Sequence, residues 1–246
     1  MRFLVEPIRV PLTPFAWVFL LIVCAILPLA ALRQHAHLAR ANLRPARTRI
    51  YASALITHLM LFALVWFTVR DTKIDLWPAH SFDGFDILVG SIALVTGLPT
   101  ILRRLRPKDP VARQRIRLIA PGTASEFGLF YLVSISAGFV EELAYRGLLF
   151  ALLSALVHSW WIAAILSAAC FGIVHLFQGW KSAGIASLIG LREQIVVGLT
   201  GTLLVAMAVH ALHDIITGTM AGLSMRTDSD VFEGAGHAVP SAIENG

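Results

Sequence analysis

Two adjacent carboxylates and an arginine lie in the otherwise apolar stretch AGFVEELAYRGLLF at 137–150: Glu141, Glu142 and Arg146. Glu142 and Arg146 are spaced i, i+4, so on a helix they share a face and can form an ion pair. Glu141 is rotated by about 100° from Glu142, which predicts that the two glutamates do not face the same partner. We expect one carboxylate to hold an internal ion pair and the other to point into a polar cavity. The alternative is an ion pair that only fixes helix packing.

Two further sets of polar residues occur in apolar segments. In FGIVHLFQG, Phe171 and His175 are spaced i, i+4, and in VHALHDIITG the same spacing joins His210 to Asp214, with His213 within reach. Taken alone, each histidine could be a hydrogen-bonded core residue or a group that joins two helices. A carboxylate four residues from a histidine could instead fix the tautomer of a site residue.

The combination of these groups favours a chemical role. A charge at the centre of a bilayer costs about 2.5–3.5 kcal/mol on insertion scales, so each group is costly unless the groups meet. A cavity that they share would contain what amide hydrolysis requires: a carboxylate as general base for water, a histidine that relays the proton, and donors that stabilise the oxyanion. We therefore expect one site made of Glu141, Glu142, Arg146, His175, His210 and Asp214.

The composition indicates that these motifs lie on membrane helices. Of the 246 residues, 57% are hydrophobic and 14% are charged, with a mean hydropathy of +0.74. A soluble domain carries about 25% charged residues. We predict an all-α fold, a polytopic integral membrane helical bundle with about seven to eight transmembrane helices, because a backbone in lipid must satisfy its own hydrogen bonds. The apolar runs are 14–32, 50–69, 86–102, 127–157, 160–177, 182–199 and 200–222.

Two of the apolar runs do not fit one upright span. The run 127–157 is too long, which predicts a tilted helix or a break near Gly138 or Gly147. The run 182–199 is interrupted by LREQ. We divide the chain into N-terminal helices with basic loops (1–120), a catalytic membrane core (121–223) and a polar tail that we expect to be disordered (224–246).

The loop charges predict the orientation. Loop 33–49 carries five arginines and no acid, loop 70–85 has three acids against two bases, and loop 103–120 has seven bases against one acid. By the positive-inside rule, the first and third loops face the cytoplasm and the N-terminus lies outside. Because the basic excess is explained by topology, we expect no nucleic-acid partner.

In this order, E-E-x-x-x-R at 141–146, F-x-x-x-H at 171–175 and H-x-x-x-D at 210–214 resemble the motifs of the CPBP family. These are the CAAX-protease and bacteriocin-processing (Abi) intramembrane proteases. The resemblance covers about 125–222, and QGW at 178–180 and TGTL at 200–203 are similar to segments that the family carries between its motifs. It implies a glutamic endopeptidase that hydrolyses a peptide bond of a membrane-associated substrate, either CAAX-like or a peptide precursor.

The resemblance also implies roles for the residues. Glu141 and His175 would activate the water molecule, and Glu142 with Arg146 would support them. His210 and the residue at 214 would form the oxyanion site. The family more often has asparagine there, and an ionised aspartate cannot donate a hydrogen bond. Asp214 is therefore either protonated or only orients His210.

Three alternatives stay open at this stage. No cofactor is expected, but Glu141, His175 and His210 could form a three-ligand zinc site with an open position. The chain could be a non-proteolytic scaffold or immunity protein of the same family. It could also be a proton-coupled transporter, since buried glutamate and histidine suit proton relays. The expected partners are the lipid bilayer and a protein or peptide substrate, and the expected location is a bacterial inner membrane.

Overall fold

The computed structural model describes residues 11–40, 46–77, 80–105 and 116–236. Within these residues the chain forms helices and no strand, as the fold class predicted. The helices are α1 (Pro14–Leu21), η1 (Ile22–Ile26), α2 (Leu27–Arg40), α3 (Arg47–Thr72), α4 (Gly84–Leu105), α6 (Ala124–Glu141), η2 (Glu142–Leu149), α7 (Phe150–Val157), α8 (Trp160–Val174), η3 (His175–Gln178), α9 (Trp180–Thr200) and α10 (Leu203–Gly236).

Six of the described helical stretches are long and apolar enough to cross a membrane, and Gly84–Pro99 of α4 is a shorter apolar helix. Together they correspond to the seven apolar runs of the sequence. The stretch Ala124–Val157 is one continuous helix of 34 residues and is not broken at a glycine. The LREQ segment does not interrupt α9 either, because α9 is helical throughout.

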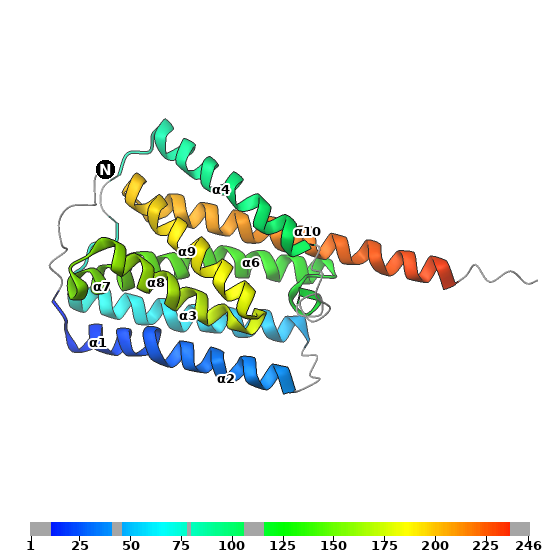
Figure 1. Ribbon diagram of the computed structural model, residues 1–246, viewed down its shortest axis with the longest axis horizontal. Coiled ribbons are helices and arrows are strands. Elements are labelled where there is room, and N and C mark those ends of the chain that lie inside the picture. The colour runs from blue at the N-terminus through cyan, green and yellow to red at the C-terminus, as the bar shows by residue number, and fades with distance from the viewer. Residues whose placement is uncertain (1–10, 41–45, 78–79, 106–115, 237–246) are drawn as a thin grey trace, which may run out of the picture.

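At the C-terminus, the last helix extends into the segment that we predicted to be a polar tail. Helix α10 continues to Gly236, past the position where we placed the start of the polar tail, and extends beyond the rest of the bundle (Figure 1). The last ten residues of that tail, 237–246, lie outside the described residues. Much of the first and third basic loops, 41–45 and 106–115, also lies outside them.

The distribution of side chains is that of a membrane protein. Large apolar side chains such as Leu59, Ile87 and Leu188 are about 70% exposed on the outer surface, whereas Glu142 and Glu193 are fully buried. Lipid can cover the apolar surface, while buried charges need partners inside the protein. The polar groups therefore meet in the interior of the bundle.

Close helix contacts bring the motif-bearing helices together. A Cβ atom added at Gly138 of α6 would lie 2.8 Å from the backbone oxygen of Met207 and 2.9 Å from the Cβ of Ala211, both on α10. Only glycine permits this approach, the usual role of small residues at membrane-helix contacts. Because Glu141 and Glu142 follow Gly138 by one turn, they lie against α10 at the level of His210.

Candidate active site

Glu142 is the centre of a buried charged group. Its Oε1 atom lies 3.2 Å from NH1 of Arg146, which confirms the ion pair predicted from the i, i+4 spacing. The same oxygen lies 2.7 Å from Nδ1 of His210 on α10. Since a carboxylate only accepts hydrogen bonds, Nδ1 of His210 carries a proton and donates it to Glu142. Glu142 therefore joins α10 to the Ala124–Val157 helix and fixes the orientation of the His210 ring.

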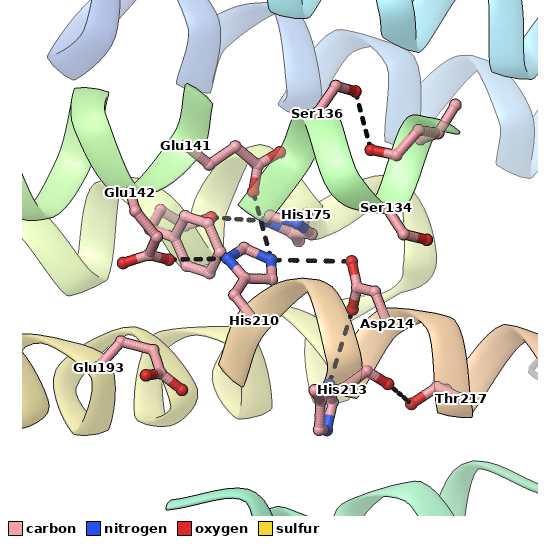
Figure 2. Close-up of polar contacts among 12 residues, drawn as sticks. Ser134, Ser136, Glu141, Glu142, His175, Glu193, His210, His213, Asp214 and Thr217 are labelled. Carbon is pink, nitrogen blue, oxygen red and sulfur yellow. Dashed lines mark hydrogen bonds and ion pairs between the residues drawn. The ribbon is translucent and has the colours of Figure 1, made fainter. Parts of the chain in front are cut away.

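Glu141 does share a partner with Glu142, contrary to our prediction. Oε2 of Glu141 lies 3.8 Å from Nε2 of His210, so the two glutamates approach opposite nitrogens of one ring (Figure 2). The helical rotation of about 100° separates the carboxylates, but an imidazole that lies between them spans this separation. The close packing at Gly138 brings the ring near enough for both contacts.

The helix changes from α to π geometry where the glutamates meet. The segment Glu142–Leu149 is a π-helical turn, and all eight of its residues are buried. Ser167 of α8 donates a hydrogen bond of 2.7 Å to the backbone oxygen of Tyr145 within this turn. π-Turns inside α-helices are frequent at functional sites. This π-helical turn thus follows directly after Glu141 and is held against α8 by the hydrogen bond from Ser167.

The second histidine motif lies beside the first glutamate. His175 begins η3, and its Nδ1 lies 2.8 Å from the backbone oxygen of Phe171, so Nδ1 is the protonated nitrogen. The ring of Phe171 contacts both histidines, with centroid distances of 4.6 Å to His175 and 6.0 Å to His210. Phe171 belongs to α8, and the guanidinium of Arg146 lies 4.0 Å from the centre of its ring. The two histidines thus lie around Phe171, and both are near Glu141 (Figure 2).

Asp214 lies at the more accessible side of the group, with 35% of its side chain exposed. Its Oδ2 is 3.7 Å from Nε2 of His210, and its Oδ1 is 3.6 Å from Nδ1 of the neighbouring His213. All six residues predicted for the site are therefore in one cluster. The nitrogen of His210 that does not donate to Glu142 faces the carboxylates of both Glu141 and Asp214.

Sequence reasoning missed two parts of this cluster. His58 of α3 lies with its Nε2 3.3 Å from Oε1 of Glu141. A histidine in an apolar run was a visible signal, but it lies outside the motifs. Glu193 of α9 is fully buried, and its Oε1 is held by the guanidinium of Arg192. We had interpreted this charged pair as an interruption of the helix, whereas each residue compensates the charge of the other.

In the part of the chain that the structure describes, no group of three or more His, Cys, Asp or Glu side chains is arranged to hold a metal ion. The zinc alternative therefore stays a sequence-based hypothesis. Glu141, His175 and His210 are near one another, but Nδ1 of His175 is used by Phe171 and Nδ1 of His210 by Glu142.

Comparison with known proteins supports the family that the motifs resemble. Residues 123–216 match the family model described as Rce1-like, type II CAAX prenyl endopeptidase. The matched segment includes all six predicted site residues, and it begins after α3 and α4. No curated protein and no solved structure gives a match. The resemblance to CAAX proteases predicted from the sequence is thus confirmed.

Proposed function

We propose that this chain, whose residues 123–216 match the Rce1-like family model of type II CAAX prenyl endopeptidases, hydrolyses a peptide bond with a water molecule activated by Glu141 and His175. The family match and the apolar helices support a CAAX-type protease of the membrane. The observation that carries the mechanistic proposal is the placement of Glu141. One of its oxygens, Oε2, accepts no hydrogen bond from the described residues although it is buried. We propose that this oxygen is the one that meets the water molecule.

In the proposed reaction, Oε2 of Glu141 takes a proton from the water as the hydroxide attacks the carbonyl carbon of the peptide bond. The unprotonated Nε2 of a neutral His175 is a second acceptor near this water, because Nδ1 holds its proton against Phe171. The proton on Glu141 then passes to the leaving amine. General-base catalysis of this kind contributes typically 10²–10⁴-fold to a rate.

His210 is the proposed donor to the oxyanion. Its Nδ1 proton is already given to Glu142, so donation to substrate requires a second proton on Nε2. The carboxylates of Glu141 and Asp214, at 3.8 and 3.7 Å, stabilise that positively charged ring. Asp214 in this proposal orients and charges His210 and does not donate itself. This supports the second of the two roles considered for Asp214.

The proposed substrate is a membrane-associated protein or peptide, either with a CAAX-like C-terminus or as a peptide precursor. The site lies among helices that can cross a membrane, so a substrate held at the bilayer would reach it. We propose a bacterial inner membrane as the location, with the N-terminus outside, on the basis of the loop charges.

The purified protein in liposomes tests the proposal. The probes are a farnesylated peptide that ends in a C-a-a-X sequence and the same peptide without the lipid, and mass spectrometry identifies the new C-terminus. We expect the wild type to cleave at least the farnesylated probe. Glu141→Gln keeps the shape of the side chain and should reduce the rate by about 10²–10⁴-fold.

Further outcomes separate the alternatives. Asp214→Asn should retain measurable cleavage, because an amide can still orient His210 by hydrogen bonding. Cleavage of both probes by Glu141→Gln at the wild-type rate would show that Glu141 is not the base. Uptake of solute or protons without cleavage would instead indicate a transporter.

A further inference from the structure

His58 brings a helix outside the family region into contact with the proposed base. It lies on α3, 65 residues before the matched segment 123–216 begins. Its side chain is buried, with 7% exposure for the residue. Nε2 of its ring lies 3.3 Å from Oε1 of Glu141, and Nδ1 lies 2.8 Å from the hydroxyl oxygen of Ser136 on α6. Both ring nitrogens therefore contact the helix that carries the glutamates.

The register between α3 and α6 makes this contact part of a regular interface. Arg47 pairs with Glu126 at a separation of 79 residues, and His58 pairs with Ser136 at 78. Between them the rings of Tyr51 and Phe130, also 79 residues apart, pack edge to face. A nearly constant separation means that the two helices run parallel and in step. His58 is therefore fixed relative to Glu141 by contacts at the start of both helices as well as by its own.

Glu141 determines which nitrogen of His58 carries a proton. A carboxylate only accepts hydrogen bonds, so Nε2 of a neutral His58 donates to Oε1 of Glu141. Nδ1 is then the acceptor on the other side of the ring, and the hydroxyl of Ser136, 2.8 Å away, can donate to it. The same hydroxyl lies 2.9 Å from the backbone oxygen of Val133, which is its alternative acceptor.

We propose that His58 is a positioning residue for Glu141: it holds Oε1 by a hydrogen bond from Nε2, while Ser136 holds Nδ1 of the same ring, and thereby leaves Oε2 as the oxygen that meets the water. The two oxygens of Glu141 differ accordingly. Oε1 contacts His58, whereas Oε2 is buried, accepts no hydrogen bond from the described residues and faces His210. This inference rests on the proposed role of Glu141 as the general base.

The first test measures cleavage of the farnesylated probe by variants of His58. His58→Leu removes both hydrogen bonds and should reduce kcat by about 10–100-fold, the usual effect of losing a group that orients a ligating or reacting residue. KM should change little, because His58 does not contact the substrate. His58→Gln retains an N–H donor and should recover most of kcat. A His58→Leu variant with the kcat of the wild type would overturn the proposal, as would equal losses in His58→Leu and His58→Gln with unchanged melting temperatures.

The second test uses two serines of one helix as a matched pair. In Ser136→Ala the group that holds Nδ1 of His58 is absent, so the ring orients Glu141 less well. The variant should lose kcat, but less than His58→Leu does, because Nε2 still contacts Glu141. Ser134→Ala is the control, because Ser134 is also buried on α6 and donates to the backbone oxygen of Phe130 at 2.9 Å. Ser134→Ala should keep the kcat of the wild type, and the same kcat in wild type and both variants would refute the proposed role of Ser136.

A measurement without substrate separates the two proposals. The difference infrared spectrum of wild type and Glu141→Gln identifies the carboxyl band of Glu141 in the resting protein. If the wild type cleaves neither probe, the proposed function fails, but the band still tests His58. The band should shift in frequency in His58→Leu, where the hydrogen bond to Oε1 is lost, and not in Ser134→Ala. An unchanged band in His58→Leu would refute the contact between His58 and Glu141.

Discussion

Replacing Glu142 by glutamine would remove the negative charge that two buried groups face at once. Oε1 of Glu142 lies 3.2 Å from Arg146 and 2.7 Å from His210. Both Glu142 and Arg146 are buried. An amide still accepts one hydrogen bond but no longer compensates the charge of the arginine. Breaking a buried ion pair on one side costs on the order of 3–5 kcal/mol in soluble proteins.

This cost gives a measurable shift in stability. For a chain of this size, 1 kcal/mol corresponds to about 2–4 °C in melting temperature, so Glu142→Gln should melt about 6–20 °C below the wild type. Glu141→Gln should melt within a few degrees of the wild type, since Oε1 accepts from His58 and an amide oxygen can do the same. The two variants should thus differ in detergent-solubilised yield and melting temperature, while both lose activity.

A double variant serves as the control. Replacing Glu142 and Arg146 together by leucine and methionine removes both charges, and well-packed apolar replacements of a buried ion pair are often neutral or stabilising. We expect this variant to recover most of the melting temperature but not the activity, because His210 loses its acceptor. The reasoning fails if Glu141→Gln is the less stable single variant, or if Glu142→Gln melts with the wild type.

The remaining predictions concern packing, topology and metal content. Gly138→Ala should disrupt the contact of α6 with α10 and lower both yield and activity, whereas Gly128→Ala, with open space beside it, should be neutral in the same assays. Single cysteines at Ala41 and Ala112 should be protected from a membrane-impermeant thiol reagent on intact cells, and a cysteine at Ala79 should be labelled; the reverse pattern would invert the topology. Dialysis against a zinc chelator should leave cleavage unchanged, and a loss that zinc restores would favour the three-ligand site.

The sequence predicted which motif residues form the site, but not which other side chains contact them. The i, i+4 spacing of Glu142 and Arg146 corresponds to a contact within one helix, and helix periodicity is sufficient to predict such a contact. The convergence of His175 and His210 with the glutamates followed from the cost of leaving them unpaired in lipid. The first argument needs only the spacing of two residues in one helix. The second needs only the free-energy cost of an unpaired charge in lipid, which does not depend on the arrangement of the helices.

The missed contacts depend on which helices are adjacent and on how far one is shifted along the other. His58 meets Glu141 only because α3 and α6 run in step, and a single sequence does not state that register. Glu141 and Glu142 both contact His210 because α6 and α10 approach closely at Gly138 and because the two ring nitrogens lie on opposite sides of the imidazole. Two adjacent charged residues in an apolar run indicated a break in the helix at Glu193. In the structure the guanidinium of Arg192 donates to Glu193, and α9 continues through both residues.

The π-helical turn at Glu142–Leu149 has a consequence for how the motif E-E-x-x-x-R is compared between proteins. A π turn closes its hydrogen bond over five residues where an α turn uses four, so each one takes up an extra residue. One residue corresponds to about 100° of rotation in an α-helix. The α-helices on the two sides of the turn are therefore out of phase, and side chains before and after it point in directions that a regular helical wheel assigns wrongly. Deleting one residue between Leu143 and Leu149 could leave a continuous helix, yet it would turn α7 relative to Glu141. Equal spacing of letters in two sequences implies equal geometry only where both chains keep this turn.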